Sequence, residues 1–127
     1  MPKQKIPSWS EYQEQKAIFE WSEKMLWKWP ELKYLNGSLN GVKLTIGQAK
    51  KAKYGGLKRG VPDISLPLAR KNWNGLFIEL KRKQGGRTSP EQKDWLMFLS
   101  NQGYYAAVAN GSEVAIRIIT EYLELEK

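Results

Sequence analysis

Polar and apolar residues follow a helical pattern in the first quarter of the chain. At the helical spacing of about 100° per residue, one face collects Glu14, Ala17, Ile18, Trp21 and Met25. Ser8 or Ser10 can cap the start of this helix, because Ser8 stands three residues before a glutamate. Pro30 cannot continue the helix, so the pattern predicts that it ends at about Trp29.

Four later segments have the character of β-strands, because short apolar or alternating runs are bounded there by turn residues. These segments are residues 31–36, 63–68, 75–81 and 104–109. A basic turn of six residues joins the second segment to the third, which favours neighbouring strands. Asn-Gly pairs close the first and the last segment.

Helix signals stand between these strands and after them. Residues 48–54 are expected to form a short helix that Gly55-Gly56 ends. Ser89-Pro90-Glu91-Gln92 has the cap, the proline and the glutamine of a helix start, and this helix should run to about Asn101. Its expected buried side chains are Trp95, Leu96, Phe98 and Leu99. Ser112 is expected to cap a last helix through Glu124.

The order of these elements predicts an α/β domain with a central mixed β-sheet flanked by helices. The step from the third strand through a helix to the fourth should be a right-handed crossover between parallel neighbours. The 127 residues suffice for one domain with a real core, but not for two. We expect residues 1–8 to be a flexible basic arm and residues 9–127 to be a single domain.

Composition restricts the chemistry that is possible here. The chain contains no cysteine and no histidine, which excludes disulfides, thiolate metal sites and the usual general base. A metal would have to sit on oxygen ligands, which favours Mg²⁺ or Mn²⁺. No apolar stretch approaches the roughly 20 residues of a membrane span, and no apolar segment follows the basic N-terminus. We therefore expect a cytoplasmic protein without membrane contact.

The net charge of +8 indicates a polyanionic partner, with nucleic acid as the first candidate. The positive side chains lie on both sides of a pair of carboxylates in the sequence. Those that precede the pair are Lys43, Lys50, Lys51, Lys53, Lys58 and Arg59. Those that follow it are Arg82, Lys83 and Arg87.

The carboxylates themselves come at the ends of two adjacent predicted strands. Asp63 directly follows Pro62 at the start of one strand, and Glu79 and Lys81 end the next. Because side chains alternate along a strand, Glu79 and Lys81 should face the same side. Together with a third acid from the first helix, these residues could hold a divalent metal and orient a water beside it. Such a group is suited to cutting a phosphodiester.

Four short motifs in this order resemble one nuclease family. Pro62-Asp63 followed by Glu79-x-Lys81 looks like the signature of the PD-(D/E)xK superfamily, and the wider context resembles a stand-alone VRR-NUC domain. The motifs are Glu11-x-x-Glu14-Gln15, Lys58-Arg59-Gly60-Val61-Pro62-Asp63-Ile64, Phe77-Ile78-Glu79-Leu80-Lys81 and Gly85-Gly86-Arg87-x-Ser89-Pro90-Glu91-Gln92-Lys93. The resemblance covers roughly residues 9–123, nearly the whole chain.

The resemblance implies a restriction-endonuclease-like core and DNA hydrolysis that depends on Mg²⁺ or Mn²⁺. It implies that Asp63, Glu79 and the carbonyl of Leu80 are metal ligands. It also implies that Lys81 orients the attacking water and stabilises charge on the phosphate. Small proteins of this kind are typical of phage and bacterial genomes, which implies the cytoplasm of a bacterium or of a phage-infected host.

Three further residues are candidates for the same site by this resemblance. The family places a glutamate of the first helix in the site, and Glu11 has the family's spacing to Gln15. Glu14 lies closer to the apolar face, so it stays open as the alternative. Gln92 matches a glutamine that family members carry after the Ser-Pro turn, and it can equally be half of a capping box.

Stand-alone members of the family look like resolvases of four-way (Holliday) junctions and are expected to act as homodimers. Two sites on a two-fold axis suit a symmetric junction. Exposed aromatics such as Trp27 and Trp29, off the expected core face of the first helix, could form the contact between the subunits.

Three other functions are alternatives to this one. A nuclease of flaps or nicks is one alternative. Another is a basic nucleic-acid-binding module without catalysis, in which aromatic side chains stack on bases. A binding module rarely places Asp and Glu within its basic surface, because these repel phosphate. A structural or partner-binding protein would account for the six tryptophans but gives no reason for the spacing of the acids.

Overall fold

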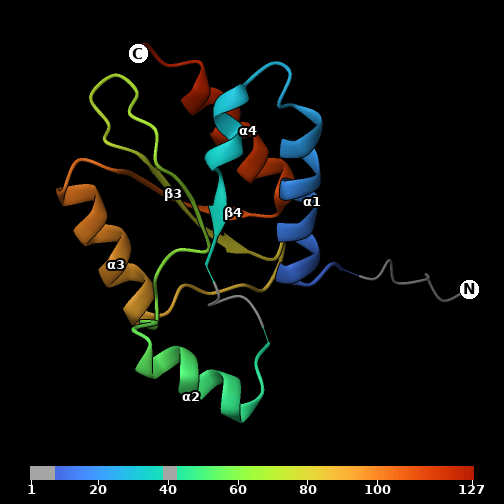
Figure 1. Cartoon of the computed structure of the whole chain (residues 1–127), viewed down its shortest axis with the longest axis vertical. Coiled ribbons are helices and arrows are strands. Elements are labelled where there is room, and N and C mark those ends of the chain that lie inside the picture. Colours follow the sequence, from blue (N-terminus) through green and yellow to red (C-terminus); the bar gives the residue numbers. More distant parts are fainter. Residues whose placement is uncertain (1–7, 39–42) are drawn as a thin grey trace, which may run out of the picture.

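A mixed β-sheet forms the centre of the molecule (Figure 1). The structure is a computed structural model that describes residues 8–38 and 43–127. Within these residues the sheet has four strands in the order β1-β2-β3-β4. The strands are β1 (Asn36–Gly37), β2 (Ile64–Leu66), β3 (Leu76–Lys81) and β4 (Tyr105–Asn110). The first two pairings are antiparallel and β3 pairs with β4 in parallel, as the predicted crossover requires.

Helices flank the sheet on both sides. They are α1 (Glu11–Lys24), α2 (Ile46–Tyr54), α3 (Pro90–Asn101) and α4 (Ser112–Leu123). Helices α1 and α4 pack on each other and against β3, whereas α3 contacts β4 from the side away from α1 (Figure 1). The predicted fold class, an α/β core with a mixed sheet between helices, is thereby confirmed. None of the described helices has the length and apolar character needed to cross a bilayer.

The core lies between the sheet and the α1/α4 layer. Alternate residues of β3 point into it, so Leu76, Ile78 and Leu80 are fully buried. Ile18 of α1 and Ile119 of α4 are equally inaccessible and belong to the same cluster. The opposite face of β3 carries Phe77, Glu79 and Lys81, and it is on this face that polar side chains meet. The alternation of one strand therefore separates the core from the candidate site.

Two expectations for the secondary structure of the first third of the chain are wrong. The first helix ends at Lys24, and the next residues form turns up to Lys28. Residues 31–36 were expected to be a strand, but Pro30–Tyr34 form a 3₁₀ helix, η1, which is followed by the two-residue strand β1. Leu32 and Leu35 are both buried at a spacing of three residues, and this spacing suits 3₁₀ geometry rather than a strand.

The C-terminal half matches its predicted boundaries more closely, with two corrections. Ser112 is the first residue of α4, and Gly111, at a φ of 92°, occupies the cap position. Phe98 was expected in the core, but 57% of it is exposed because α3 presents Leu99 to the sheet instead.

In the N-terminal third, Trp29 is not the surface residue that the sequence predicted, since it packs partly buried against the core beside Trp21. The expected arm, residues 1–8, lies outside the described residues except for its last residue.

Candidate active site

The register of β2 on β3 brings the two predicted carboxylates together. Ile64 pairs with Ile78, and continuing this antiparallel register by one residue places Asp63 opposite Glu79. Asp63 Oδ2 accepts a hydrogen bond of 2.8 Å from the backbone N–H of Leu80. Both carboxylates are buried, with exposed fractions of 6% and 2%. Two acids far apart in sequence thus share one desolvated position.

Pro62 explains why the strand pairing stops at this point. Extending the register once more would set Pro62 opposite Leu80, but proline has no N–H to donate to the carbonyl of Leu80. The N–H of Leu80 is instead taken by the side chain of Asp63. The Pro-Asp pair therefore ends the β2–β3 ladder and leaves the Leu80 carbonyl without a strand donor on that side.

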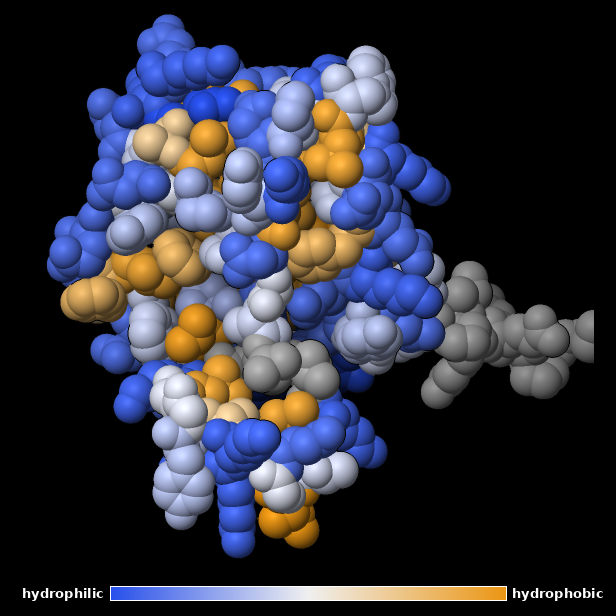
Figure 2. Space-filling view, in the orientation of Figure 1, coloured by the Kyte–Doolittle hydropathy of each residue, from blue (hydrophilic) through white to orange (hydrophobic). Residues whose placement is uncertain are grey.

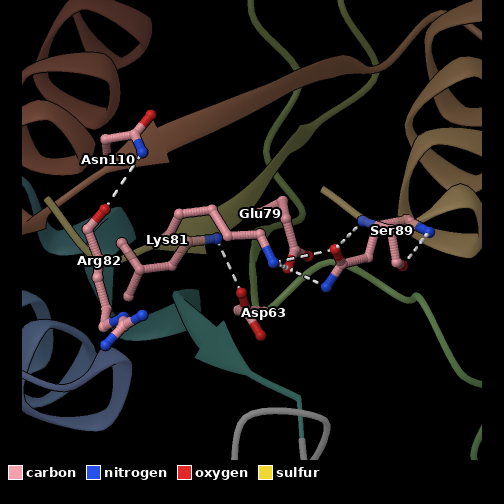
Figure 3. A network of polar contacts seen from close by, with 8 residues as sticks. Asp63, Glu79, Lys81, Arg82, Ser89 and Asn110 are labelled. Atoms are coloured by element: carbon pink, nitrogen blue, oxygen red, sulfur yellow. Dashed lines mark hydrogen bonds and ion pairs between the residues drawn. The ribbon is translucent and has the colours of Figure 1, made fainter. Parts of the chain in front are cut away.

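Lys81 and Gln92 complete the group (Figure 3). Lys81 Nζ donates to Gln92 Oε1 at 3.0 Å and lies 3.5 Å from Glu79 Oε1. Gln92 Nε2 in turn donates to Glu79 Oε1 at 2.7 Å. Lys81 is only 6% exposed, so its ammonium is held within the site rather than displayed on the surface. These contacts bring Asp63, Glu79, Lys81 and Gln92 together, and the catalytic and metal-binding roles expected of them stay predictions.

Gln92 also forms the capping box that the sequence predicted at the start of α3. Its Oε1 also accepts from the N–H of Ser89, and the Ser89 hydroxyl accepts from the N–H of Gln92. The same amide therefore fixes the start of α3 and bridges Lys81 to Glu79. The capping-box interpretation of Gln92 is confirmed, and its role in catalysis stays a prediction.

Burial and proximity change the acidity of both carboxyl groups. Burial, and then the charge of Asp63, raise the pKa of Glu79 to about 8, although Lys81 partly opposes this. Burial also raises the pKa of Asp63, against the hydrogen bond from Leu80. Because the two groups interact, they titrate as a pair. The protein without a cation therefore holds a proton at this site near neutral pH.

This arrangement makes stability depend on pH in a definite direction. An acid whose pKa is raised from 4.5 to about 8 by folding stabilises the fold below pH 4.5, and this stabilisation is lost as the pH rises through 8. We expect Glu79→Gln, which cannot ionise, to gain thermal stability over the wild type progressively across this range in EDTA. Melting temperatures of both proteins at several pH values measure it. A difference that does not grow with pH would contradict the assigned environment of Glu79.

The acids of α1 do not join the pair. Glu14 is 1% exposed, its Oε1 accepts from the Ser112 hydroxyl at 3.1 Å, and its Oε2 has no hydrogen-bond partner. It thus lies at the start of α4, where its charge is favourable and where Gly111 offers no capping side chain. Glu11 is half-buried one turn earlier. Among the described residues no three acids are close enough to hold a metal together, so a catalytic role for Glu11 or Glu14 stays a prediction.

Gln15 is half-buried, whereas the basic residues predicted to bind DNA are exposed. Gln15 reaches strand β1, since its Nε2 would lie 2.6 Å from a Cβ built on Gly37. The predicted DNA-binding side chains are on the surface: Lys43, Lys50, Lys53, Lys58, Arg59, Arg82, Lys83 and Arg87. Lys83 lies 3.7 Å from the exposed Glu113, so part of its charge is offset.

Two glycines contribute to the site, and sequence reasoning did not give them that role. A Cβ on Gly86 would lie 2.9 Å from the Cβ of Lys81, so the bare backbone of Gly86 makes room for that side chain. Gly60, at a φ of 97°, packs on the backbone of Glu91 in the first turn of α3. Their place within the Gly-Val-Pro-Asp and Gly-Gly-Arg motifs is the signal that could have found them.

Comparison with known proteins agrees with the motifs. A family model described as the VRR-NUC domain matches residues 3–113. Among solved structures, a chain titled "VRR_NUC domain protein" is 30% identical and superimposes with a TM-score of 0.80, over 96% of this chain and 94% of that one. A search of curated proteins found no match.

Proposed function

Because this chain belongs to the VRR-NUC domain family and has its nuclease-type fold, we propose that it is a metal-dependent endonuclease that cleaves branched DNA as a homodimer. One observation carries the chemistry. Asp63 and Glu79 meet at the ends of paired strands with Lys81 held beside them, and basic side chains surround them. A non-catalytic binding module would gain nothing from two buried acids in a basic surface.

The donor set fits Mg²⁺ or Mn²⁺. The oxygens available are those of Asp63, Glu79 and the Leu80 carbonyl, and hard divalent cations prefer such ligands. Glu79 Oε2 is buried without a hydrogen-bond partner, and both acids have a raised pKa in the absence of a cation. These are features of a site that can accept a further positive charge beside Lys81. A bound cation would polarise the phosphate and lower the pKa of a water.

The side chains around this position have separate tasks in the proposal. Lys81 is placed to orient a water and to neutralise charge that develops on the phosphate. Gln92 holds the Lys81 ammonium and the Glu79 carboxylate in fixed relation through its two amide atoms. Burial keeps bulk water away and strengthens each of these interactions.

The exposed cations supply the footprint for DNA. Lys50 and Lys53 lie on α2, Lys58 and Arg59 precede Asp63, and all four are exposed. Cations in such positions contact phosphates without reading sequence, so they position the backbone over the site. Arg82 and Arg87 can extend the footprint on the other side of Lys81.

The dimer contact is proposed to involve Trp27 rather than Trp29. Trp27 is 78% exposed, which is unusual for the largest apolar side chain. A two-fold axis at such a patch would give two sites for the two strands that a symmetric junction presents.

We expect the protein to cut a labelled four-way junction in preference to linear duplex, in paired opposite strands, and only with Mg²⁺ or Mn²⁺. EDTA should stop cleavage, and metal should raise the melting temperature of the wild type but not of Asp63→Asn. Sedimentation should give about twice the 14.7 kDa chain mass for the wild type. The Trp27→Lys variant should give the mass of a single chain. A monomer that cuts junction, flap and duplex at equal rates would remove the junction and dimer proposals and leave the nuclease.

A further inference from the structure

A pocket of about 640 Å³ lies between α2 and the start of α3, next to the candidate active site. Its lining residues are Leu44, Ala49, Lys53, Leu57, Arg59, Gly60, Ser89 and Gln92. Gln92 is the same residue that bridges Lys81 and Glu79. Gln92 therefore reaches from the wall of the pocket to Glu79.

The backbone builds this pocket in advance of any ligand. A capping box between Thr45 and Gln48 starts α2. At its other end Gly56 has a φ of 104° and Leu57 N–H donates to Ala52 O at 2.9 Å, which turns the chain back so that Leu57 becomes a wall. Gly60 then packs on the first turn of α3 and fixes the distance between the two helices.

The lining combines two chemistries that a nucleotide also combines. Leu44, Ala49 and Leu57 give the wall apolar surface, and Lys53 and Arg59 give it positive charge. Helix α2 contains three lysines and no acidic residue, so its whole surface attracts phosphate. Figure 2 shows orange apolar atoms beside blue hydrophilic ones at the end of the molecule that α2 forms. The volume lies in the range of small-molecule sites in proteins.

We propose that this pocket takes one unpaired nucleotide of the DNA strand being cut, with the base against Leu44, Ala49 and Leu57 and a phosphate against Lys53 and Arg59. The proposal rests on the proposed function and adds to it a source of structure selectivity. A base inside an intact duplex cannot enter without being unpaired and unstacked, whereas a base at a branch point can enter at lower cost. The pocket would then favour DNA with unpaired nucleotides over perfect duplex.

The test measures binding in EDTA, so that it does not depend on cleavage. Two labelled single-stranded probes of equal length are compared, an octathymidylate and an octamer of abasic deoxyribose phosphates. Both carry the same phosphates, so their difference in affinity reports contacts to bases. We expect the wild type to prefer the thymidylate by about tenfold, which is near the lower end of the range for a base stacked on an aromatic side chain because the wall here is aliphatic.

Matched variants locate this preference. Ala49→Trp places an indole in the pocket, and Leu44→Asn removes apolar wall without filling it, so both should bring the preference close to one. Gly47→Trp adds the same indole to the same helix, where an added Cβ has no atom within 4 Å, and should keep the preference. Lys53→Gln should weaken both probes alike. Melting temperatures confirm that each variant is folded.

Two results would contradict the proposal that this pocket binds a nucleotide. One is a wild type that binds both probes equally, and the other is a preference for thymidylate that persists in both Ala49→Trp and Leu44→Asn. A wild type that shows the preference but never cleaves with metal would instead overturn the proposed nuclease and leave a nucleotide-binding pocket.

Discussion

Replacing Asp63 or Glu79 by alanine is expected to abolish DNA cleavage while DNA binding persists. Asp63 is held by the N–H of Leu80, and Glu79 by the amide of Gln92, so each carboxylate has a defined position at the ends of the paired strands. In the proposed mechanism, removing either carboxylate takes an oxygen ligand and a charge from the site. Losses of about a thousandfold are the upper scale for single preorganised electrostatic groups, and a lost ligand should reach at least that.

The affinity for DNA should not fall with the cleavage rate. The carboxylates repel phosphate, so their removal should leave the affinity for DNA in EDTA unchanged or tighten it. Asp94→Ala is the matched control, because it removes the same charge from the exposed surface of α3 and should change neither quantity. Initial rates with Mg²⁺ and gel shifts in EDTA separate the two effects. Full Mg²⁺-dependent cleavage by Asp63→Ala or Glu79→Ala would refute the assignment of the site.

Local signals were sufficient for the parts of the fold that position this site. Local residues mark where α3 begins, at Ser-Pro-Glu-Gln, and where β3 lies, in a short apolar run. The structure has α3 at Pro90–Asn101 and β3 at Leu76–Lys81. The alternation of β3 further predicted that Glu79 and Lys81 share a face. The register of β2 on β3 then brings Asp63 to them, a contact for which the Pro-Asp motif is the only local sign.

Errors arose where partners distant in sequence decide the outcome. Glu14 was placed correctly on the apolar face of α1, where it is buried, but its partner, the Ser112 hydroxyl at the start of α4, could not be found from α1 alone. Phe98 was placed in the core because it is apolar, but the facing of α3 is set by how Leu99 meets the sheet. Trp29 is covered for a similar reason, since it packs against Trp21 after the chain has turned.

The site contains one relation that no pattern of residue types could give. Gly86 lies against Lys81 so closely that a methyl group would press on its stem. The double glycine suggests a turn by itself, and Gly85 does have a φ of 79°. The space that Gly86 leaves for the side chain of Lys81 appears only when the loop after β3 is folded back on the strand.

Lys81→Ala is expected to slow the chemical step by about a hundredfold or more and to leave DNA affinity and its salt dependence nearly unchanged. The reason is the confinement of the ammonium. Its Nζ is 3.0 Å from Gln92 Oε1 and 3.5 Å from Glu79 Oε1, and the side chain is 6% exposed. A cation held in this way acts on the phosphate at the reacting position but adds little to the broad footprint.

Exposed cations should show the reverse behaviour. Arg59→Ala or Arg87→Ala should weaken binding and flatten the dependence of log affinity on log salt by about one unit for each lost phosphate contact, with the single-turnover rate preserved at saturation. Lys83→Ala is the comparison for Lys81→Ala, since Lys83 is exposed and two residues from Lys81 in the sequence, and it should behave like the arginine variants. Gly86→Ala should reproduce part of the loss seen in Lys81→Ala, with charge intact, because the added methyl displaces the lysine. If Lys81→Ala changed only affinity and its salt slope, the lysine would belong to the footprint, and the proposed chemistry would need another group to neutralise the phosphate.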